Sequence, residues 1–186
     1  EVGEQVMDLL AGREVWFSPE SQVTAVDEKK GALSFRDGTD ARYDLLIAVP
    51  GHKSSQVVKD AGLVKKGEWV SVDRETLATA FDGVYAIGDV TAIPLANGLM
   101  LPKAGVFAHG EAEVVARNIA AEVNGSRRWS FGGEGACFLE AGYGKAAYAV
   151  GKFFAEPEPQ VKLRNPSPWW HWAKRGYERL WLRRWF

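Results

Sequence analysis

The sequence has little cysteine, no long apolar run and no charge imbalance. Cys137 is the only cysteine among the 186 residues, so no disulfide can form within this chain, and a cytoplasmic, reducing compartment is the simplest interpretation. No run of about 18 apolar residues occurs, so we expect no segment of this sequence to span a membrane. With 23 basic and 24 acidic residues, the net charge of -1 argues against a surface that attracts nucleic acid as a whole.

Two kinds of binding motif are also missing. His52 and His109 have no Cys or His companion at metal-ligand spacing, so we interpret both as structural and expect no metal site. The Gly-x-Gly-x-x-Gly loop that holds the pyrophosphate of a dinucleotide does not occur in this sequence. The first residues, EVGEQVMDLLAG, have the pattern of an amphipathic helix entered part-way, so we expect the chain to be a piece of a longer protein.

Hydrophobic patterning predicts a mixed α/β fold with an α+β tail. It predicts a helix over Glu1–Ala11 that stops at Gly12, followed by three short strands. These strands are expected at Glu14–Ser18, Gln22–Asp27 and Ala32–Arg36. Tyr43–Val49 is nearly continuous apolar sequence closed by Pro50–Gly51, which is typical of a strand buried on both faces of a parallel sheet.

The rest of the sequence is predicted to contain a long helix between strands. A buried strand over Val84–Ile87 ends in Gly88–Asp89, and the helix runs from Gly105 to Val123. Beyond it we expect strands at Ala136–Glu140 and Lys145–Phe153, a proline-rich linker at Glu156–Pro168, and an aromatic, basic helix at Trp170–Phe186.

The stretch Thr79–Asp89, TAFDGVYAIGD, carries the strongest functional signal. A buried strand that ends in Gly-Asp places a carboxylate at the edge where α/β sheets bind ligands. Asp89 can accept hydrogen bonds there from a sugar or polyol, and Gly88 lets a ligand approach the backbone closely. Taken alone, a Gly-Asp after a strand is more often an ordinary surface turn.

This stretch resembles the second flavin-binding signature of the FAD-dependent pyridine nucleotide-disulfide oxidoreductases, in which a Thr and a spacer precede Val/Ile-Tyr/Phe-Ala-x-Gly-Asp. The resemblance implies that Asp89 holds the ribityl chain of FAD. Tyr43–Gly51 looks like the last strand of an NAD(P)H-binding domain, and Trp69–Asp73 looks like the return to the FAD domain. The implied fold is the C-terminal portion of a glutathione-reductase-like flavoprotein with two dinucleotide-binding domains. Its expected parts are the end of the NAD(P)H-type domain (residues 1–50), the returning FAD domain (51–125) and a C-terminal segment (126–186).

Lys103, Ala104 and Gly105 lead directly into the predicted long helix. A helix N-terminus offers free N–H groups and a partial positive charge, which suit an anionic oxygen. In the family that the sequence resembles, these N–H groups face the pyrimidine side of the flavin and stabilise its anionic reduced form. The alternative is an ordinary helix start.

Cys137 lies in a predicted strand, within GEGACFLEAG. A free cysteine is usually a small buried apolar side chain without chemistry. The alternative rests on resemblance: sulfide:quinone oxidoreductases and flavocytochrome sulfide dehydrogenases place a redox cysteine at a similar point, after the helix and before the final helix. Its disulfide partner would then lie outside these residues. Both interpretations stay open.

The last segment, Trp170–Phe186, is chemically distinct, because five of the eight tryptophans fall in the last 18 residues. Its order of Trp, His, Lys, aromatic, Glu and aromatic resembles the sulfide:quinone oxidoreductase tail, in which an aromatic at the position of Tyr177 lines the quinone pocket. Trp with Lys and Arg on one helix also suits a membrane–water interface. The alternative is a terminal helix docked on its own protein.

Together these features predict that the intact protein is an FAD enzyme that passes two electrons from sulfide or a pyridine nucleotide, NAD(P)H, to a quinone or another acceptor. Cys137 is the candidate redox residue. The expected partners are the quinone, a membrane surface touched by Trp170–Phe186, and a second copy of the chain. We expect these 186 residues alone to be inactive. Two alternatives remain: an NAD(P)H-dependent flavoprotein reductase without cysteine chemistry, and a non-catalytic interaction or membrane-docking module.

Overall fold

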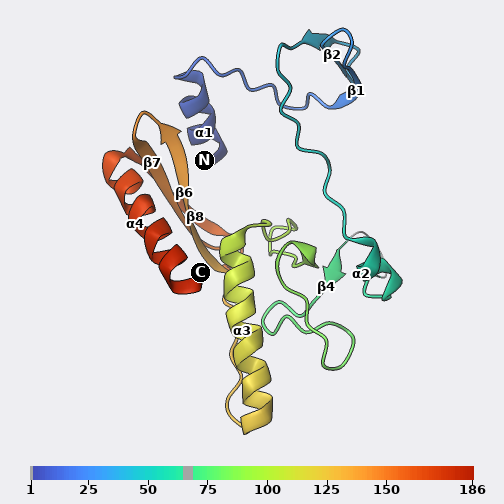
Figure 1. The fold of residues 1–186 in the computed structure, drawn as a ribbon, viewed down its shortest axis with the longest axis vertical. Helices are drawn as coiled ribbons and strands as arrows, with labels where there is room; N and C mark the ends of the chain where they lie inside the picture. Colours follow the sequence, from blue (N-terminus) through green and yellow to red (C-terminus); the bar gives the residue numbers. More distant parts are fainter. Residues whose placement is uncertain (1, 65–68) are drawn as a thin grey trace. The chain divides into compact units, whose positions relative to one another are not determined.

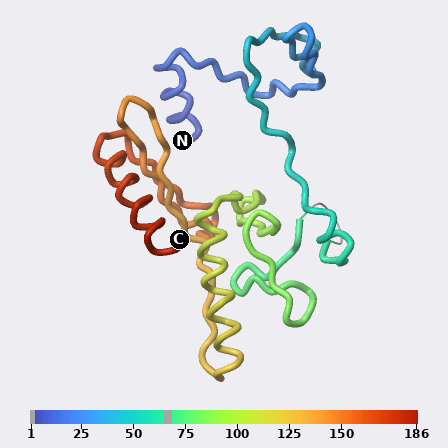
Figure 2. The backbone as a smooth tube through the Cα atoms, viewed as in Figure 1, coloured from blue at the N-terminus to red at the C-terminus, as the bar shows by residue number. Residues whose placement is uncertain are grey.

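The computed structural model describes residues 2–64 and 69–186 (Figure 1, Figure 2). The chain divides into two compact units, Glu1–His52 and Lys53–Phe186. Helices and strands occur together in both units and are joined by long irregular segments. This is the mixed α/β fold that the sequence predicts.

The first unit contains one helix and a small antiparallel sheet. α1 spans Val2–Ala11, close to its predicted bounds. β1 (Val23–Asp27), β2 (Ala32–Phe35) and β3 (Asp40–Arg42) pair in that order, and the sequence predicts the first two but not the third. Gly31, between β1 and β2, has φ +59°, and a Cβ there would lie 2.9 Å from the Tyr43 oxygen. The turn therefore requires glycine.

Two predicted strands of the first unit are wrong. Glu14–Ser18 is irregular, and Tyr43–Val49 runs without strand pairing. Leu45, Ile47 and Val49 are 78%, 85% and 82% exposed. A strand buried on both faces needs neighbouring strands and covering layers. The described residues of this unit place no such neighbour beside the segment.

The second unit begins with short elements that lead to a long helix. α2 (Gln56–Asp60) is followed by β4 (Val70–Ser71), which pairs in parallel with β5 (Thr91–Ala92). A single 3-10 turn, η1 (Gly88–Val90), comes immediately before β5. α3 spans Gly105–Asn124 and confirms the predicted long helix.

The predicted strand at Val84–Ile87 does not form a regular strand. Tyr85 makes an isolated antiparallel bridge to Ala78, and the Ala86 N–H donates to the Leu77 oxygen at 3.1 Å. The segment folds back on residues 77–79 because Gly83, with φ +70°, reverses the chain just before it. Gly88 and Asp89 consequently follow a tight local turn.

The second unit ends in an antiparallel sheet with a helix packed against it. β6 (Glu134–Gly142), β7 (Lys145–Lys152) and β8 (Gln160–Ser167) pair in that order, and α4 (Pro168–Trp185) lies along them (Figure 1). The two predicted strands and the final helix are confirmed. The predicted linker at Glu156–Pro168 is wrong, since most of it forms β8. Pro166, the proline within β8, is tolerated because β8 is an edge strand, where a residue without an N–H disturbs the ladder least.

An apolar core joins the start of α3 to the C-terminal sheet. Its buried members are Leu77, Ile93, Leu95, Leu101, Phe107, Val114 and Phe131. Phe107, in the first turn of α3, meets Phe153 edge-on with 4.9 Å between ring centroids. Burying one such ring stabilises the fold by roughly 1.5–3 kcal/mol. This packing holds the N-terminus of α3 against the sheet.

Candidate functional site

The Gly88–Asp89 turn packs directly on α3. Gly88 has φ +71°, and a Cβ on it would lie 3.2 Å from the Cβ of Ala108. The Thr91 hydroxyl donates to the Gly88 oxygen at 2.9 Å and closes the turn. A side chain at this position would combine backbone strain with a close contact to the helix. Glycine therefore allows the turn and α3 to approach each other.

Lys103 ties together the backbone around this turn. Its Nζ donates to the main-chain oxygens of Asp89 (2.5 Å) and Thr91 (2.9 Å) and lies 3.7 Å from the centre of the Trp69 ring. Burial lowers the pKa of Lys103, against the opposing effect of the Asp89 and Glu111 charges. The lysine thus cross-links the segment before β4 with the segment that forms η1 and β5.

Glu111 completes the cluster, and sequence reasoning missed it. Its side chain is buried in the second turn of α3, and its Oε2 accepts a hydrogen bond from the Gly88 N–H at 2.5 Å. Burial raises the pKa of this carboxyl, the Gly88 N–H lowers it, and the Asp89 charge raises it further. The signal lay in the helix pattern: Glu111 shares the buried stripe of α3 with Phe107 and Val114, where an acidic residue is unusual.

The N-terminus of α3 lies at the same place. Ala104 is its N-cap residue and makes no side-chain cap, and Gly105 is the first helical residue. The first N–H groups of a helix have no partner within the helix, so an uncapped end can receive an acceptor from a ligand. A small pocket has Gly88, Asp89, Lys103, Ala104 and Glu111 in its lining, together with Thr91 and apolar neighbours. The structure thus brings together four of the predicted cofactor residues, with Gly105 adjoining them.

Cys137 lies on the face of the C-terminal sheet that meets the start of α3. It is exposed, and it pairs with Ala149 in β7. Gly135, two residues earlier on the same face, has so little room that a Cβ there would overlap the Phe107 ring. Since alternate residues of a strand share a face, the thiol projects on the side of the sheet that carries Phe107.

Tyr177 lies on the opposite side of this sheet from Cys137. Its ring centroid is 6.2 Å from that of Phe138, which neighbours Cys137 in β6 and therefore points the other way. Phe138 also meets Tyr148, on which Trp170 stacks at 4.7 Å. The sheet therefore separates these two predicted site residues.

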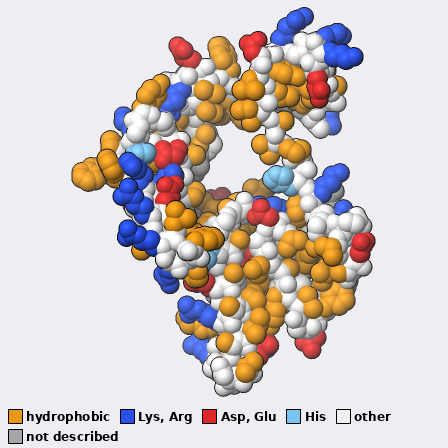
Figure 3. All heavy atoms as spheres, viewed as in Figure 1, with side chains coloured by type: hydrophobic (Ala, Val, Ile, Leu, Met, Phe, Trp, Pro, Cys, Tyr) orange, Lys and Arg blue, Asp and Glu red, His pale blue; other side chains and the backbone are white. Residues whose placement is uncertain are grey.

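α4 is docked on its own protein along one side and exposed on the other. Besides Trp170 and Tyr177, the docked side includes Trp181, whose ring lies 4.7 Å from that of His109 on α3. Trp169 and Trp172 are 82% and 62% exposed. Basic side chains accompany the exposed apolar ones over this helix, as the surface view shows (Figure 3). The docked side agrees with the interpretation of a terminal helix packed on its own protein, and the membrane contact stays a prediction.

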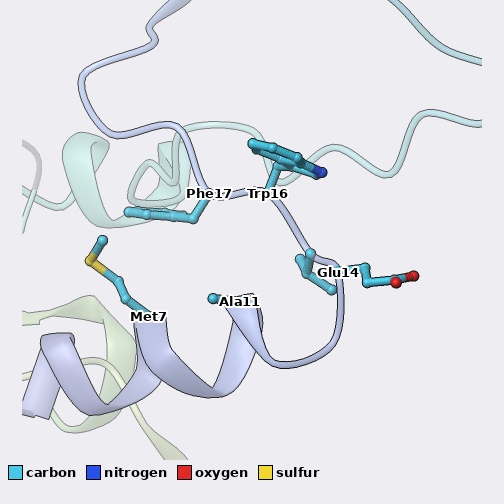
Figure 4. A pocket seen from close by; sticks show the side chains of 6 residues that line it. Met7, Ala11, Glu14, Trp16 and Phe17 are labelled. Carbon is cyan, nitrogen blue, oxygen red and sulfur yellow. The ribbon is translucent and has the colours of Figure 1, made fainter.

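Another pocket lies within the first unit. Met7, Ala11, Glu14, Val15, Trp16 and Phe17 line it. Figure 4 shows the Met7 and Phe17 side chains pointing toward one another above α1.

Within residues 2–64 and 69–186, no group of three or more His, Cys, Asp or Glu side chains is placed to hold a metal ion. The same part of the chain has no helix that is both long and apolar enough to cross a bilayer.

Comparison with known proteins assigns the chain to a family. Residues 1–113 match the pyridine nucleotide-disulphide oxidoreductase family, which is more than half of the chain. The chain belongs to this family. Its members are FAD-dependent oxidoreductases, so the sequence resemblance at Thr79–Asp89 is confirmed at the level of the family. The matched residues include Gly88, Lys103 and Glu111, whereas Cys137 and Tyr177 lie beyond them.

Two oxidoreductases of known organisms are similar in sequence to parts of this chain. The mitochondrial sulfide:quinone oxidoreductase of Schizosaccharomyces pombe is 31% identical over 143 residues, which is 75% of this chain and 29% of that protein. The type II NADH:quinone oxidoreductase of Haemophilus influenzae is 31% identical over 97 residues, 51% of this chain and 22% of that protein. The chain thus spans less than a third of either relative's length.

Solved structures share the fold. The sulfide:quinone oxidoreductase of Aquifex aeolicus superimposes with a TM-score of 0.79 at 22% identity, and the match covers 96% of this chain and 44% of that one. The reduced CoADR-RHD of Bacillus anthracis gives a TM-score of 0.55 at 19% identity over 79% of this chain and 26% of that one. At such identities the likeness concerns the fold alone. The chain has the fold of part of a two-dinucleotide-domain flavoprotein.

Proposed function

We propose that the intact protein is an FAD-dependent oxidoreductase of the sulfide:quinone type, which takes two electrons from sulfide and passes them to a quinone. The observation that carries this proposal is the cluster at the start of α3, where the Gly88–Asp89 turn, Lys103 and an uncapped helix end meet. The similarity to a named sulfide:quinone oxidoreductase supports the choice of donor and acceptor.

The residues present suit a flavin nucleotide. Asp89 is exposed, and its main-chain oxygen rather than its carboxylate is bound by Lys103, so the carboxylate can accept hydrogen bonds from a polyol chain. The N-terminus of α3, at Gly105, can donate N–H groups to a carbonyl or an anionic oxygen. Bound FAD would supply the two-electron chemistry. The residues described here would orient it and stabilise negative charge at the helix end.

Cys137 is proposed as the sulfide-side residue. Its thiol is exposed on the sheet face that carries Phe107 of α3, so it faces the side on which the flavin cluster lies. It would form one half of a redox disulfide whose second cysteine lies outside these 186 residues. Sulfide would attack one sulfur of that disulfide and break the S–S bond, which leaves a persulfide on one cysteine and a thiolate on the other. The thiolate would hold the electron pair that is passed on to the acceptor side.

The acceptor side is proposed to lie at α4. Tyr177 would line the quinone pocket, and the exposed Trp169 and Trp172 would touch the membrane surface from which a quinone is drawn. Residues 1–50, 51–125 and 126–186 would then be the end of the NAD(P)H-type domain, the returning FAD domain and the acceptor segment.

A second candidate is an NADH-dependent quinone reductase that needs no cysteine. The similarity to a type II NADH:quinone oxidoreductase favours it. In this function Cys137 would have no chemical role. A non-catalytic docking module is the remaining alternative.

One experiment separates these functions. The full-length protein is purified, its visible spectrum is recorded, and sulfide or NADH is added without oxygen. We expect a yellow protein that is bleached by sulfide and regains its colour with a quinone. Bleaching by NADH alone would support the reductase, and a colourless protein that takes up no FAD would exclude both enzymes.

A further inference from the structure

Glu111 is a buried carboxyl to which the proposed function assigns no role. Among the described residues it is the only charged side chain in the buried class, with 1% of its surface exposed. Such a group is costly to bury unless it is hydrogen-bonded or neutral. Glu111 lies between Phe107 and Val114 on the buried side of α3, so the cost of its burial must be offset by another interaction.

A hydrogen bond from the Gly88–Asp89 turn offsets the cost of burying this carboxyl. Glu111 Oε2 accepts from the Gly88 N–H at 2.5 Å, which links α3 to the turn that precedes Asp89. The carboxyl is the only side chain of α3 in the described structure that hydrogen-bonds this turn. Losing the acceptor would leave the Gly88 N–H without a partner and free the turn to shift.

The charges around Glu111 come from two other segments. Asp89 follows Gly88 in the turn, and Lys103 approaches from the segment before α3. The Lys103 ammonium binds the main-chain oxygens of Asp89 and Thr91. Burial and the Asp89 charge raise the pKa of Glu111, and the positive charge of Lys103 opposes them. An ionised Glu111 would place a second negative charge beside Asp89, where an anionic nucleotide is proposed to bind.

We propose that Glu111 is a positioning residue of the flavin site, whose carboxyl holds the Gly88–Asp89 turn against α3 and binds a proton while the flavin nucleotide is bound. This rests on the proposed FAD-binding function. The protonated carboxyl still offers an oxygen to the Gly88 N–H but adds no charge to the site. The raised pKa of Glu111, caused first by its burial, is consistent with such a proton.

The inference predicts a pH dependence of FAD affinity with a definite sign. As pH rises through the Glu111 pKa, the carboxyl ionises and repels the anionic nucleotide, so the affinity falls. In Glu111→Gln the side chain is neutral at every pH and its amide oxygen can still accept from Gly88. That variant should keep the low-pH affinity of the wild type throughout.

The test uses the full-length protein stripped of FAD, and it measures the dissociation constant of FAD by fluorescence titration from about pH 5 to pH 9. Glu113→Gln is the matched control, since it makes the same change two residues away on α3 at a partly exposed position. We expect on the order of tenfold weaker binding at the upper pH for the wild type and for Glu113→Gln, and a flat profile for Glu111→Gln. Glu111→Ala should bind FAD about tenfold more weakly even at low pH.

Two results would overturn the inference. One is a Glu111→Gln profile that matches the wild type, and the other is a folded Glu111→Ala that binds FAD as tightly as the wild type at low pH. If circular dichroism shows Glu111→Ala to be unfolded, the Glu111→Gln profile alone decides. A wild-type protein that binds no FAD at any pH would instead refute the proposed function, and this inference with it.

Discussion

The Nζ of Lys103 donates a hydrogen bond to the main-chain oxygen of Asp89, fourteen positions earlier in the chain. The same ammonium reaches the Thr91 oxygen and covers the Trp69 ring. The Lys103 side chain therefore holds the backbone of Asp89 in position, and Asp89 is the residue that the family signature assigns to flavin binding. In this protein the geometry of the signature depends on residues outside it.

Replacing this lysine should loosen the turn. Lys103→Met removes both hydrogen bonds and the cation–ring contact, and we expect it to lower the free energy of unfolding of the full-length protein by about 1–3 kcal/mol. Thermal unfolding measures the change, and FAD release on dilution should accelerate. Lys59→Met, on the exposed surface of α2, is the control and should leave both unchanged. Equal behaviour of the two variants would contradict the role of Lys103.

Gly88→Ala separates backbone strain from contact with α3. The φ of Gly83 is +70° and that of Gly88 is +71°, but a Cβ at Gly83 would meet nothing within 4 Å. Gly83→Ala should cost about 1 kcal/mol of stability through strain alone. Gly88→Ala should cost a further 1–3 kcal/mol, roughly, because its methyl group would press on Ala108. Denaturant unfolding of both variants measures the difference, and a zero difference would mean that α3 yields without cost.

Cys137 should decide between the two electron donors. In the full-length protein, Cys137→Ala is expected to lower the rate of flavin reduction by sulfide at least about a hundredfold. The visible spectrum and the melting temperature should not change, because the side chain is exposed. Stopped-flow absorbance after addition of sulfide measures the rate. Undiminished reduction by sulfide would remove the cysteine from the mechanism and favour the NADH-dependent alternative.

The two sides of α4 should respond differently to loss of tryptophan. Trp170→Ala removes the stacking on Tyr148 and should destabilise the protein by about 1–3 kcal/mol. Replacing Trp169 and Trp172 together by Ala should leave the melting temperature within error, since both are exposed. The double variant should nevertheless bind anionic lipid vesicles about tenfold more weakly in a sedimentation assay.

A matched surface change tests whether vesicle binding is specific to α4. Trp16 is 94% exposed but lies in the first unit. Trp16→Ala should bind vesicles as the wild type does. If all these variants sediment equally with vesicles, the exposed side of α4 is not a membrane contact.

The sequence by itself determined the elements that are specified by a pattern of neighbouring residues, such as helical periodicity or a short motif. The periodicity over Gly105–Asn124 and Pro168–Trp185 was sufficient to predict both long helices, and the Thr79–Asp89 signature led to the family. The predictions at Tyr43–Val49 and Val84–Ile87 were wrong because an apolar run does not specify whether neighbouring strands are present.

Tertiary structure alone decided how the site is assembled. Glu111 accepts a hydrogen bond from Gly88, which lies 23 positions earlier in the sequence. Lys103 binds main-chain oxygens, which every residue type has, so the residue types of the sequence do not indicate these partners. Alternation along β6 points Cys137 and Phe138 to opposite sides of one sheet, and docking of α4 places Tyr177 on the Phe138 side. Such relationships depend on long-range packing and strand pairing, whereas composition and periodicity report only what each residue and its near neighbours prefer.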